Sequence, residues 1–255
     1  VLSLWCIKTK FPILKMEPGE WKLHGKHIGI LCKMGIPMGL QYSITAIGSV
    51  ILQAAVNSMG ESVIAAVSAG TKISMFLCCP FDAMGSTMAT YGGQNVGAKK
   101  MDRVDAALKA CIKLGIVYAI LAFVFILLFG KNLALLFLDA EETEIIKLVY
   151  YSLLGNSGAY ILLALVNIVR FMIQGLGYSA FAVIAGICEM VARTIAGFIL
   201  VPKFGYVFVA LGSPLAWIFA DIFLIPAYIY VVKRLRRKFG QETPAMLKRC
   251  QKNLA

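Results

Sequence analysis

Six long apolar stretches follow one another along the 255-residue chain, and they limit its possible folds more than any other feature. Each holds roughly 20 or more mostly apolar residues, the length that a helix needs to cross a bilayer. They are too long, and alternate too little, for the strands of a membrane barrel. The sequence therefore predicts an all-α membrane protein with about six transmembrane helices, over residues 30–58, 63–92, 106–130, 145–172, 179–201 and 207–232.

Composition and the breaks between the stretches agree with this class. Hydrophobic residues make up 60% of the chain and charged residues 15%, and a soluble domain of this size needs more charge. Glycine-rich segments at 92–97 and 174–177 are predicted to end the second and fourth helices. No Ser-rich linker or low-complexity tract interrupts the sequence, so we expect one compact helical unit.

The net charge of +12 is unevenly distributed. Lys and Arg gather in the N-terminal segment, between Lys99 and Arg103, and in the C-terminal tail, whereas residues 139–144 are acidic. Since cytoplasmic loops retain Lys and Arg, we predict a multi-pass protein of the cell (inner or plasma) membrane with both ends of this chain cytoplasmic. The basic tail fits contact with membrane lipids. It does not indicate nucleic-acid binding, because aromatic residues do not interleave with it.

The first residues are unusual. Val1–Ile7 is apolar and precedes Lys8 and Lys10, the reverse of the order in a signal peptide. We therefore expect this chain to be the C-terminal part of a longer protein.

The sequence offers no catalytic motif. The seven cysteines form no CxxC pair and lie mostly in apolar stretches, where cysteine behaves as a small apolar residue. His24 and His27 are three apart, a spacing that could hold a metal, but solvated residues are the preferred interpretation because no acidic or Cys partner accompanies them. HExxH, GxSxG and Walker motifs are missing. We predict that the protein is not an enzyme and needs no cofactor.

Glu189 and Arg193 are the foremost ionisable candidates at membrane depth, where charges are costly. Four residues apart, they share one helical face. They either neutralise each other and fix helix packing, or form a coupling or gating pair at a cavity. Arg170 is interpreted as a side chain that extends to the cytoplasmic surface.

Asp82 is a second candidate for coupling or gating. It follows Pro80, which removes one backbone hydrogen bond from its helix. The carboxylate could meet a cation or water there, or accept a hydrogen bond from the backbone or another helix. Asp221, which precedes Pro226, is interpreted as structural.

Neutral polar residues form two stripes at helical spacing. They predict the wall of a substrate cavity for varied organic molecules, with interhelical hydrogen bonding as the alternative. The first stripe includes residues repeating every four positions, and the second is shorter. The candidates are Gln41, Tyr42, Thr45, Ser49, Gln53 and Asn57 in the first stripe, and Asn156, Tyr160 and Asn167 in the second.

Three segments resemble the multidrug and toxic compound extrusion (MATE) family. They are Gly35-Ile-Pro-Met-Gly-Leu-Gln41, Tyr91-Gly-Gly-Gln-Asn-Val-Gly-Ala-Lys-Lys100 and Asp102-Arg-Val104. The resemblance covers nearly the whole chain. It implies a twelve-helix transporter of two six-helix lobes, which exports cationic or amphipathic organic compounds in exchange for sodium or protons by a rocker-switch motion.

On that resemblance this chain is the C-terminal lobe, helices seven to twelve, and its partner is the N-terminal lobe of the same transporter. Residues 1–27 would hold the end of a preceding helix and a cytoplasmic linker, 28–234 the lobe, and 235–255 a basic cytoplasmic tail. Some members have a Glu where Thr45 stands, and some an Asp near the position of Leu163; the coupling ion stays open between sodium and proton.

Two other functions remain as alternatives. A lipid-linked oligosaccharide flippase of related fold would need a strongly cationic cavity, for which Arg170 and Arg193 are the candidates. The other is a non-transporting membrane scaffold; loss of drug resistance on changing Gln53 or Glu189 in the complete protein, without loss of expression, would argue against it.

Overall fold

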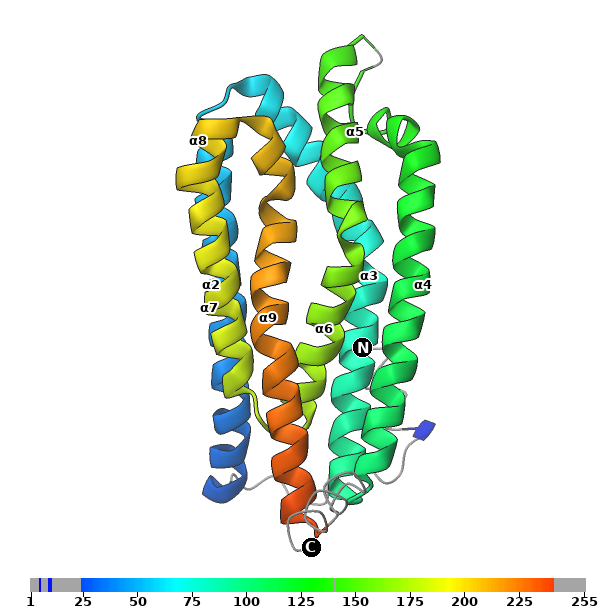
Figure 1. Ribbon diagram of the computed structural model, residues 1–255, viewed down its shortest axis with the longest axis vertical. Coiled ribbons are helices and arrows are strands. Elements are labelled where there is room, and N and C mark those ends of the chain that lie inside the picture. Colours follow the sequence, from blue (N-terminus) through cyan, green and yellow to red (C-terminus); the bar gives the residue numbers. More distant parts are fainter. Residues whose placement is uncertain (1–4, 6–8, 11–23, 140, 241–255) are drawn as a thin grey trace, which may run out of the picture.

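The computed structural model describes residues 5, 9–10, 24–139 and 141–240. The rest of the predicted linker and the end of the predicted tail lie outside these residues. The described chain is a bundle of long helices (Figure 1). In chain order they are α2 (Gly25–Asn57), α3 (Glu61–Gly97), α4 (Met101–Ala134), α5 (Thr143–Gly158), α6 (Tyr160–Gly175), α7 (Ala180–Ile195), the π-helix η2 (Ala196–Leu200), α8 (Val201–Phe204) and α9 (Tyr206–Lys238).

The prediction of about six membrane spans is confirmed. Five helices, counting α7 through α8 as one, are long and apolar enough to cross a bilayer, and α5 with α6 supplies a sixth. Successive spans run in opposite directions, so the start of α2, the α3–α4 turn and the end of α9 lie at the same end of the bundle (Figure 1). These are the segments rich in Lys and Arg. The chain is a multi-pass membrane protein.

The fourth span is not the continuous helix that its apolar stretch predicts. It breaks at Ala159, where α5 and α6 meet at 50°. Gly155 and Gly158 weaken the helix here. The Asn156 amide also donates to the Ser152 carbonyl at 3.1 Å, and such side-chain bonds compete with or bend the regular helix.

The glycine-rich segment at 92–97 contains the end of α3, as predicted, but it stays helical as far as Gly97. A Cβ at Gly92 would lie 2.7 Å from the Met172 sulfur on α6. A Cβ at Gly175 would lie 2.2 Å from the Ala89 carbonyl oxygen on α3. The glycines therefore allow two helices to approach closely, as small residues do in membrane bundles, and this packing keeps the segment helical.

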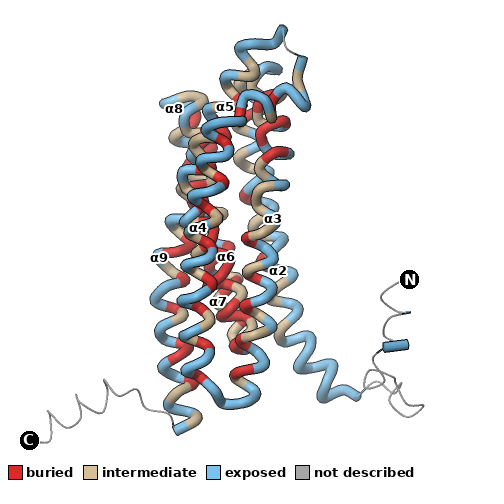
Figure 2. The backbone as a smooth tube through the Cα atoms, turned by 90° about the vertical axis from the view of Figure 1, so that its right-hand side faces the viewer, coloured by how far each residue is buried: buried red, intermediate tan, exposed pale blue. Residues whose placement is uncertain are grey.

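Two groups of helices meet along α9. α2 packs chiefly on α7, and α3 packs on α4, α5 and α6, whereas α2 and α3 contact each other little. Buried residues follow the inner sides of the helices in Figure 2, and much of the first half of α2 is exposed. Large apolar side chains such as Leu121, Leu128 and Ile222 are exposed, which suits contact with lipid. The divergence of α2 from α3 leaves room for a cavity.

Candidate functional site

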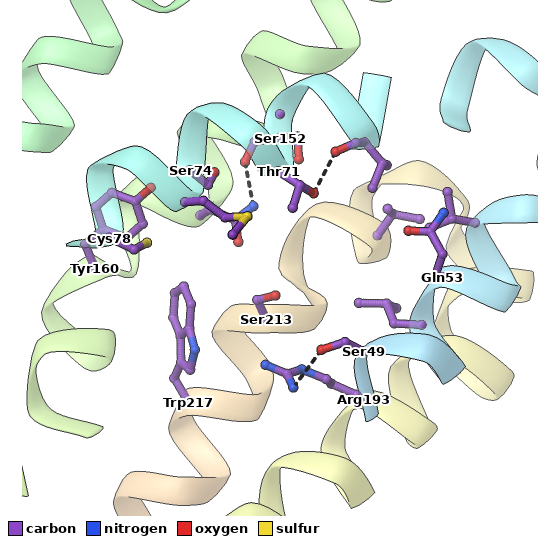
Figure 3. A pocket seen from close by; sticks show the side chains of 17 residues that line it. Ser49, Gln53, Thr71, Ser74, Cys78, Ser152, Tyr160, Arg193, Ser213 and Trp217 are labelled. Atoms are coloured by element: carbon purple, nitrogen blue, oxygen red, sulfur yellow. Dashed lines mark hydrogen bonds between the residues drawn. The ribbon is translucent and has the colours of Figure 1, made fainter. Parts of the chain in front are cut away.

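A polar cavity of about 300 Å³ opens between α2, α3, α5, α6, α7 and α9 (Figure 3). It lies in the half of the bundle that contains the α2–α3 turn, beside the break between α5 and α6. Apolar side chains such as Leu52 and Val67 complete its wall. The polar and aromatic lining residues are Ser49, Gln53, Thr71, Ser74, Cys78, Ser152, Asn156, Tyr160, Arg193, Ser213 and Trp217.

The cavity is close to neutral apart from Arg193. Within the described part of the chain, Arg193 is the one lining residue with a formal charge, and no carboxylate lines the cavity. Hydroxyl groups are in part satisfied within their own helices, since Thr71 donates to the Val67 carbonyl at 2.7 Å. Such a wall can offer hydrogen bonds and apolar contact to an organic molecule.

Arg193 of α7 lines the cavity and also forms hydrogen bonds with α2. Its Nη1 donates to the Thr45 carbonyl oxygen at 3.0 Å and to the Ser49 Oγ at 3.2 Å. The one-turn π-helix η2 begins three residues later, at Ala196. Such turns inside α-helices often occur at functional sites, and this one lies next to the charged residue of the cavity.

Arg170, Glu189 and Arg193 form what we name the core charge cluster. All three are buried, with exposed fractions of 5%, 2% and 8%. The Arg170 Nη2 donates to the Glu189 Oε1, and the Arg193 Nη2 lies 3.8 Å from the Glu189 Oε2. The predicted pairing of Glu189 with Arg193 is thus present, but the hydrogen-bonded partner of Glu189 is Arg170.

The interpretation that Arg170 extends to the cytoplasmic surface is wrong, since it is buried against Glu189 of α7. Arg170 and Glu189 lie on different helices, so the periodicity of one helix gives no sign of their contact. Asp221 is also buried, and its carboxylate oxygens accept no hydrogen bond from any residue that the structure describes.

Some residues of the first predicted stripe line the cavity, and others pack against a neighbouring helix. Ser49 and Gln53 line the cavity, whereas Gln41 is buried and accepts a hydrogen bond from Gln174 at 3.0 Å. A spacing of four residues turns the stripe by about 40° per step around a helix of 3.6 residues per turn, so its ends face different neighbours. Tyr42 is 55% exposed.

The remaining members of this stripe, Thr45 and Asn57, lie next to the residues that line the cavity. Thr45 contributes its carbonyl to Arg193. Asn57, in the last turn of α2, accepts a hydrogen bond from Gln53 at 2.9 Å through its Oδ1. Neither lines the cavity among the described residues.

The second stripe divides at the helix break. Asn156 and Tyr160 line the cavity. Asn167, two turns beyond the break on α6, instead donates to the Asp82 Oδ1 of α3 at 2.9 Å. The hydrogen-bonded alternative for Asp82 is therefore the arrangement in this structure.

Several lining residues were not predicted, although the sequence places some of them at helical spacing. Thr71, Ser74 and Cys78 share one face of α3 at helical spacing, and Ser213 and Trp217 do the same on α9. Ser152 likewise precedes the predicted Asn156 by four residues on α5.

These features define a class, a multi-pass helical membrane protein with a polar cavity and a buried cluster of charges. Residues 37–199 match the model of the MatE family. Because this is more than half of the chain, the protein belongs to the MatE family, the multidrug and toxic compound extrusion transporters.

Two curated relatives are similar to part of the chain. The chain is 23% identical over 166 residues to the "Probable multidrug resistance protein YoeA" of Bacillus subtilis, covering 62% of this chain and 36% of that protein. It is also 23% identical over 161 residues to the "FAD transporter" of Shewanella oneidensis, covering 63% and 35%. The chain thus matches about a third of the length of each.

Solved structures share the fold. An outward-facing multidrug resistance MATE transporter of the MOP superfamily superposes with a TM-score of 0.83 at 18% identity, over 92% of this chain and 53% of that one. A MOP superfamily transporter from Pyrococcus furiosus, described as having a binding pocket of reverse polarity, gives 0.70 at 20% identity, over 94% and 54%. The chain thus spans about half the length of these structures.

Proposed function

We propose that this chain forms the C-terminal six-helix lobe of a twelve-helix MATE-type transporter that exports organic compounds by rocker-switch alternating access. The polar cavity carries the proposal. Eleven polar or aromatic side chains from six helices converge on a space within a membrane bundle, and secondary transporters place their substrate sites in such positions.

An exposed polar stripe on α3 supports the presence of a second lobe. Asp82, Ser86, Thr90 and Gln94 are exposed and spaced along one face of a helix long enough to span the bilayer. Ser86 and Thr90 satisfy their hydroxyls within α3, at 3.0 and 3.1 Å, but the Asp82 carboxylate and the Gln94 amide are poorly suited to lipid. A partner lobe, with water between, would give this face suitable surroundings.

Coupling to sodium or protons is part of the proposal. Among the described carboxylates, Asp82 is the stronger candidate, because it accepts one hydrogen bond from Asn167 and remains exposed. Glu189 is held by Arg170, so it is better suited to fixing or gating the α6–α7 contact. A carboxylate of the proposed N-terminal lobe is the remaining possibility.

The cavity favours amphipathic compounds over the cationic ones that the family resemblance also implies. A cation would meet Arg193 with no lining carboxylate in the described chain to balance it. The flippase alternative is weakened as well, since the guanidinium of Arg170 is engaged with Glu189 and leaves Arg193 as the sole cation for a pyrophosphate among the described lining residues.

The test is transport by the full-length protein in proteoliposomes under an imposed sodium or proton gradient. We expect export of an amphipathic fluorescent dye that stops when an ionophore dissipates the gradient. Ser49→Ala, which alters the cavity wall, should lower the rate about threefold to tenfold through loss of one hydrogen bond. Ser43→Ala removes a matched hydroxyl on the exposed side of α2 and should leave the rate unchanged.

Absence of transport by well-folded full-length protein under either gradient would overturn the proposal in favour of a scaffold. Transport at full rate by this six-helix chain expressed alone would overturn the two-lobe arrangement. The proposed cytoplasmic location of both ends is tested separately, by the accessibility of single cysteines placed in the α3–α4 turn and in the 139–144 turn.

A further inference from the structure

We infer that the polar cavity binds organic anions, specifically compounds that join a carboxylate or phosphate group to an aromatic ring. Arg193 would hold the anionic group, and Trp217 would contact the ring. The inference rests on the proposed function for its biological meaning, because it names the substrate class of that same cavity.

The charge balance around Arg193 is the first support. An arginine side chain stays protonated at any physiological pH. Glu189 is shared by two arginines, and its hydrogen bond goes to Arg170. The carboxylate therefore serves Arg170 first, and Arg193 keeps a contact of 3.8 Å with Glu189. The cavity side of the cluster remains positive.

The donors of Arg193 are the second support. Its Nη1 is occupied by the Thr45 carbonyl and the Ser49 hydroxyl. Its Nη2 makes no hydrogen bond with any described residue, since 3.8 Å to Glu189 is too long for one. The guanidinium is thus held in place from one side and keeps donors free, and its planar fork matches the oxygens of a carboxylate or phosphate.

The remaining wall indicates what accompanies the anionic group. Figure 3 shows Trp217 and Arg193 on the same side of the cavity, facing the side chains of Thr71 and Ser74. Tyr160, which lies beside Cys78 in Figure 3, has its ring centroid 6.4 Å from that of Trp217. Aromatic faces favour offset contact with another ring, and the hydroxyls opposite supply neutral hydrogen bonds. A flat ring bearing an oxyanion satisfies both parts of the site.

The test measures binding of four matched probes to the full-length protein in detergent by titration calorimetry. The probes are 2-naphthoate, 2-naphthyl phosphate, neutral 2-naphthamide and cationic 2-naphthylmethylammonium. We expect the naphthoate or the naphthyl phosphate to bind about tenfold more tightly than the amide, as a charge-assisted hydrogen bond predicts, and the cation to bind most weakly. Which anion is preferred will distinguish a carboxylate ligand from a phosphate ligand.

Arg193→Gln should abolish the preference for the anion over the amide. Because that substitution leaves Glu189 with one partner and so bears on folding as well, Asn156→Asp provides a second variant that retains the core charge cluster. It places a carboxylate in the cavity wall with no change in size, and should shift the preference toward 2-naphthylmethylammonium. Asn132→Asp, the same exchange at an exposed position near the end of α4, should leave all four affinities unchanged.

The inference is overturned if the cation binds as tightly as either anion, if none of the probes binds, or if Asn156→Asp leaves the order of affinities as it was. Its failure is separable from that of the proposed function. Dye export together with tighter binding of the cation would contradict the anion site but support the proposed transport function. Anion binding without transport of any probe in proteoliposomes would support the anion site but contradict the proposed transport function.

Discussion

Among the described residues, two clusters of acidic and basic side chains connect helices, one within the bundle and one at its Lys- and Arg-rich end. In the core charge cluster, two arginines share the carboxylate of Glu189, and all of these side chains are buried. In what we name the end cluster, Arg236 of α9 serves two carboxylates of α4, at 2.6 Å from Asp105 and 3.0 Å from Asp102.

The core cluster has two arginines to one carboxylate, and the end cluster has one arginine to two carboxylates. The two clusters also differ in their exposure to solvent. The Asp102 side chain is 92% exposed, whereas that of Glu189 is 3% exposed. Water can stabilise an excess carboxylate at the end of the bundle but not an excess guanidinium at its centre. The end cluster can therefore lose a member with little loss of folding stability. The stability of the core cluster depends on each of its members or on a bound anion.

Glu189→Gln should have the largest effect. It leaves Arg170 and Arg193 buried without the carboxylate that they share, and breaking a buried pair costs about 3–5 kcal/mol. The measurement is the free energy of unfolding in mixed micelles under increasing SDS. Glu189→Asp, which keeps the charge, should lose less; equal losses from the two variants would show that the charge is not what matters.

Arg236→Gln should have an intermediate effect, about 1 kcal/mol, because the pairs that it breaks are partly exposed and Asp105 keeps its hydrogen bond from Tyr228 at 2.8 Å. Raising the salt concentration should shrink this loss, since ions screen exposed charges. The loss in Glu189→Gln should stay the same over that range. A loss in Arg236→Gln that does not respond to salt would contradict the contrast between the clusters.

Asp102→Asn should have the smallest effect, within about 0.5 kcal/mol, as for most exposed substitutions. Its side chain accepts one hydrogen bond from Arg236 at 3.0 Å, and Asp105 remains as the closer partner. The same SDS titration measures it. A destabilisation comparable to that of Glu189→Gln would show that the end cluster is as tightly coupled as the core one.

Much of the fold could be predicted from sequence, because membrane spans need only length and low charge. The prediction failed at two places for different reasons. The bend at Ala159 arises from local features, namely Gly155, Gly158 and the hydrogen bond from Asn156 to Ser152. The extension of α3 through residues 92–97 depends on contacts with another helix, such as that of Gly92 with Met172. Local propensity carries no trace of those contacts.

The candidate site was predicted in part for the same reason. Ser49, Gln53, Asn156, Tyr160 and Arg193 were found by helical spacing and line the cavity. The pairing of Arg170 with Glu189 was missed, because the two residues are 19 positions apart in sequence and lie on different helices. No helical periodicity links them. Which end of a polar stripe faces the cavity likewise depends on how the helix is rotated in the bundle.

The contact between Gly175 and Ala89 has a consequence for how the protein can move. At this point α6 and α3 touch backbone to backbone, with no side chain of Gly175 between them. Side chains can change rotamer and let helices slide, but a peptide group cannot. α3 and α6 therefore travel as one stiff unit, and any rearrangement that changes the shape of the cavity must come from α2 with α7 on one side or from α5, beyond its bend, on the other.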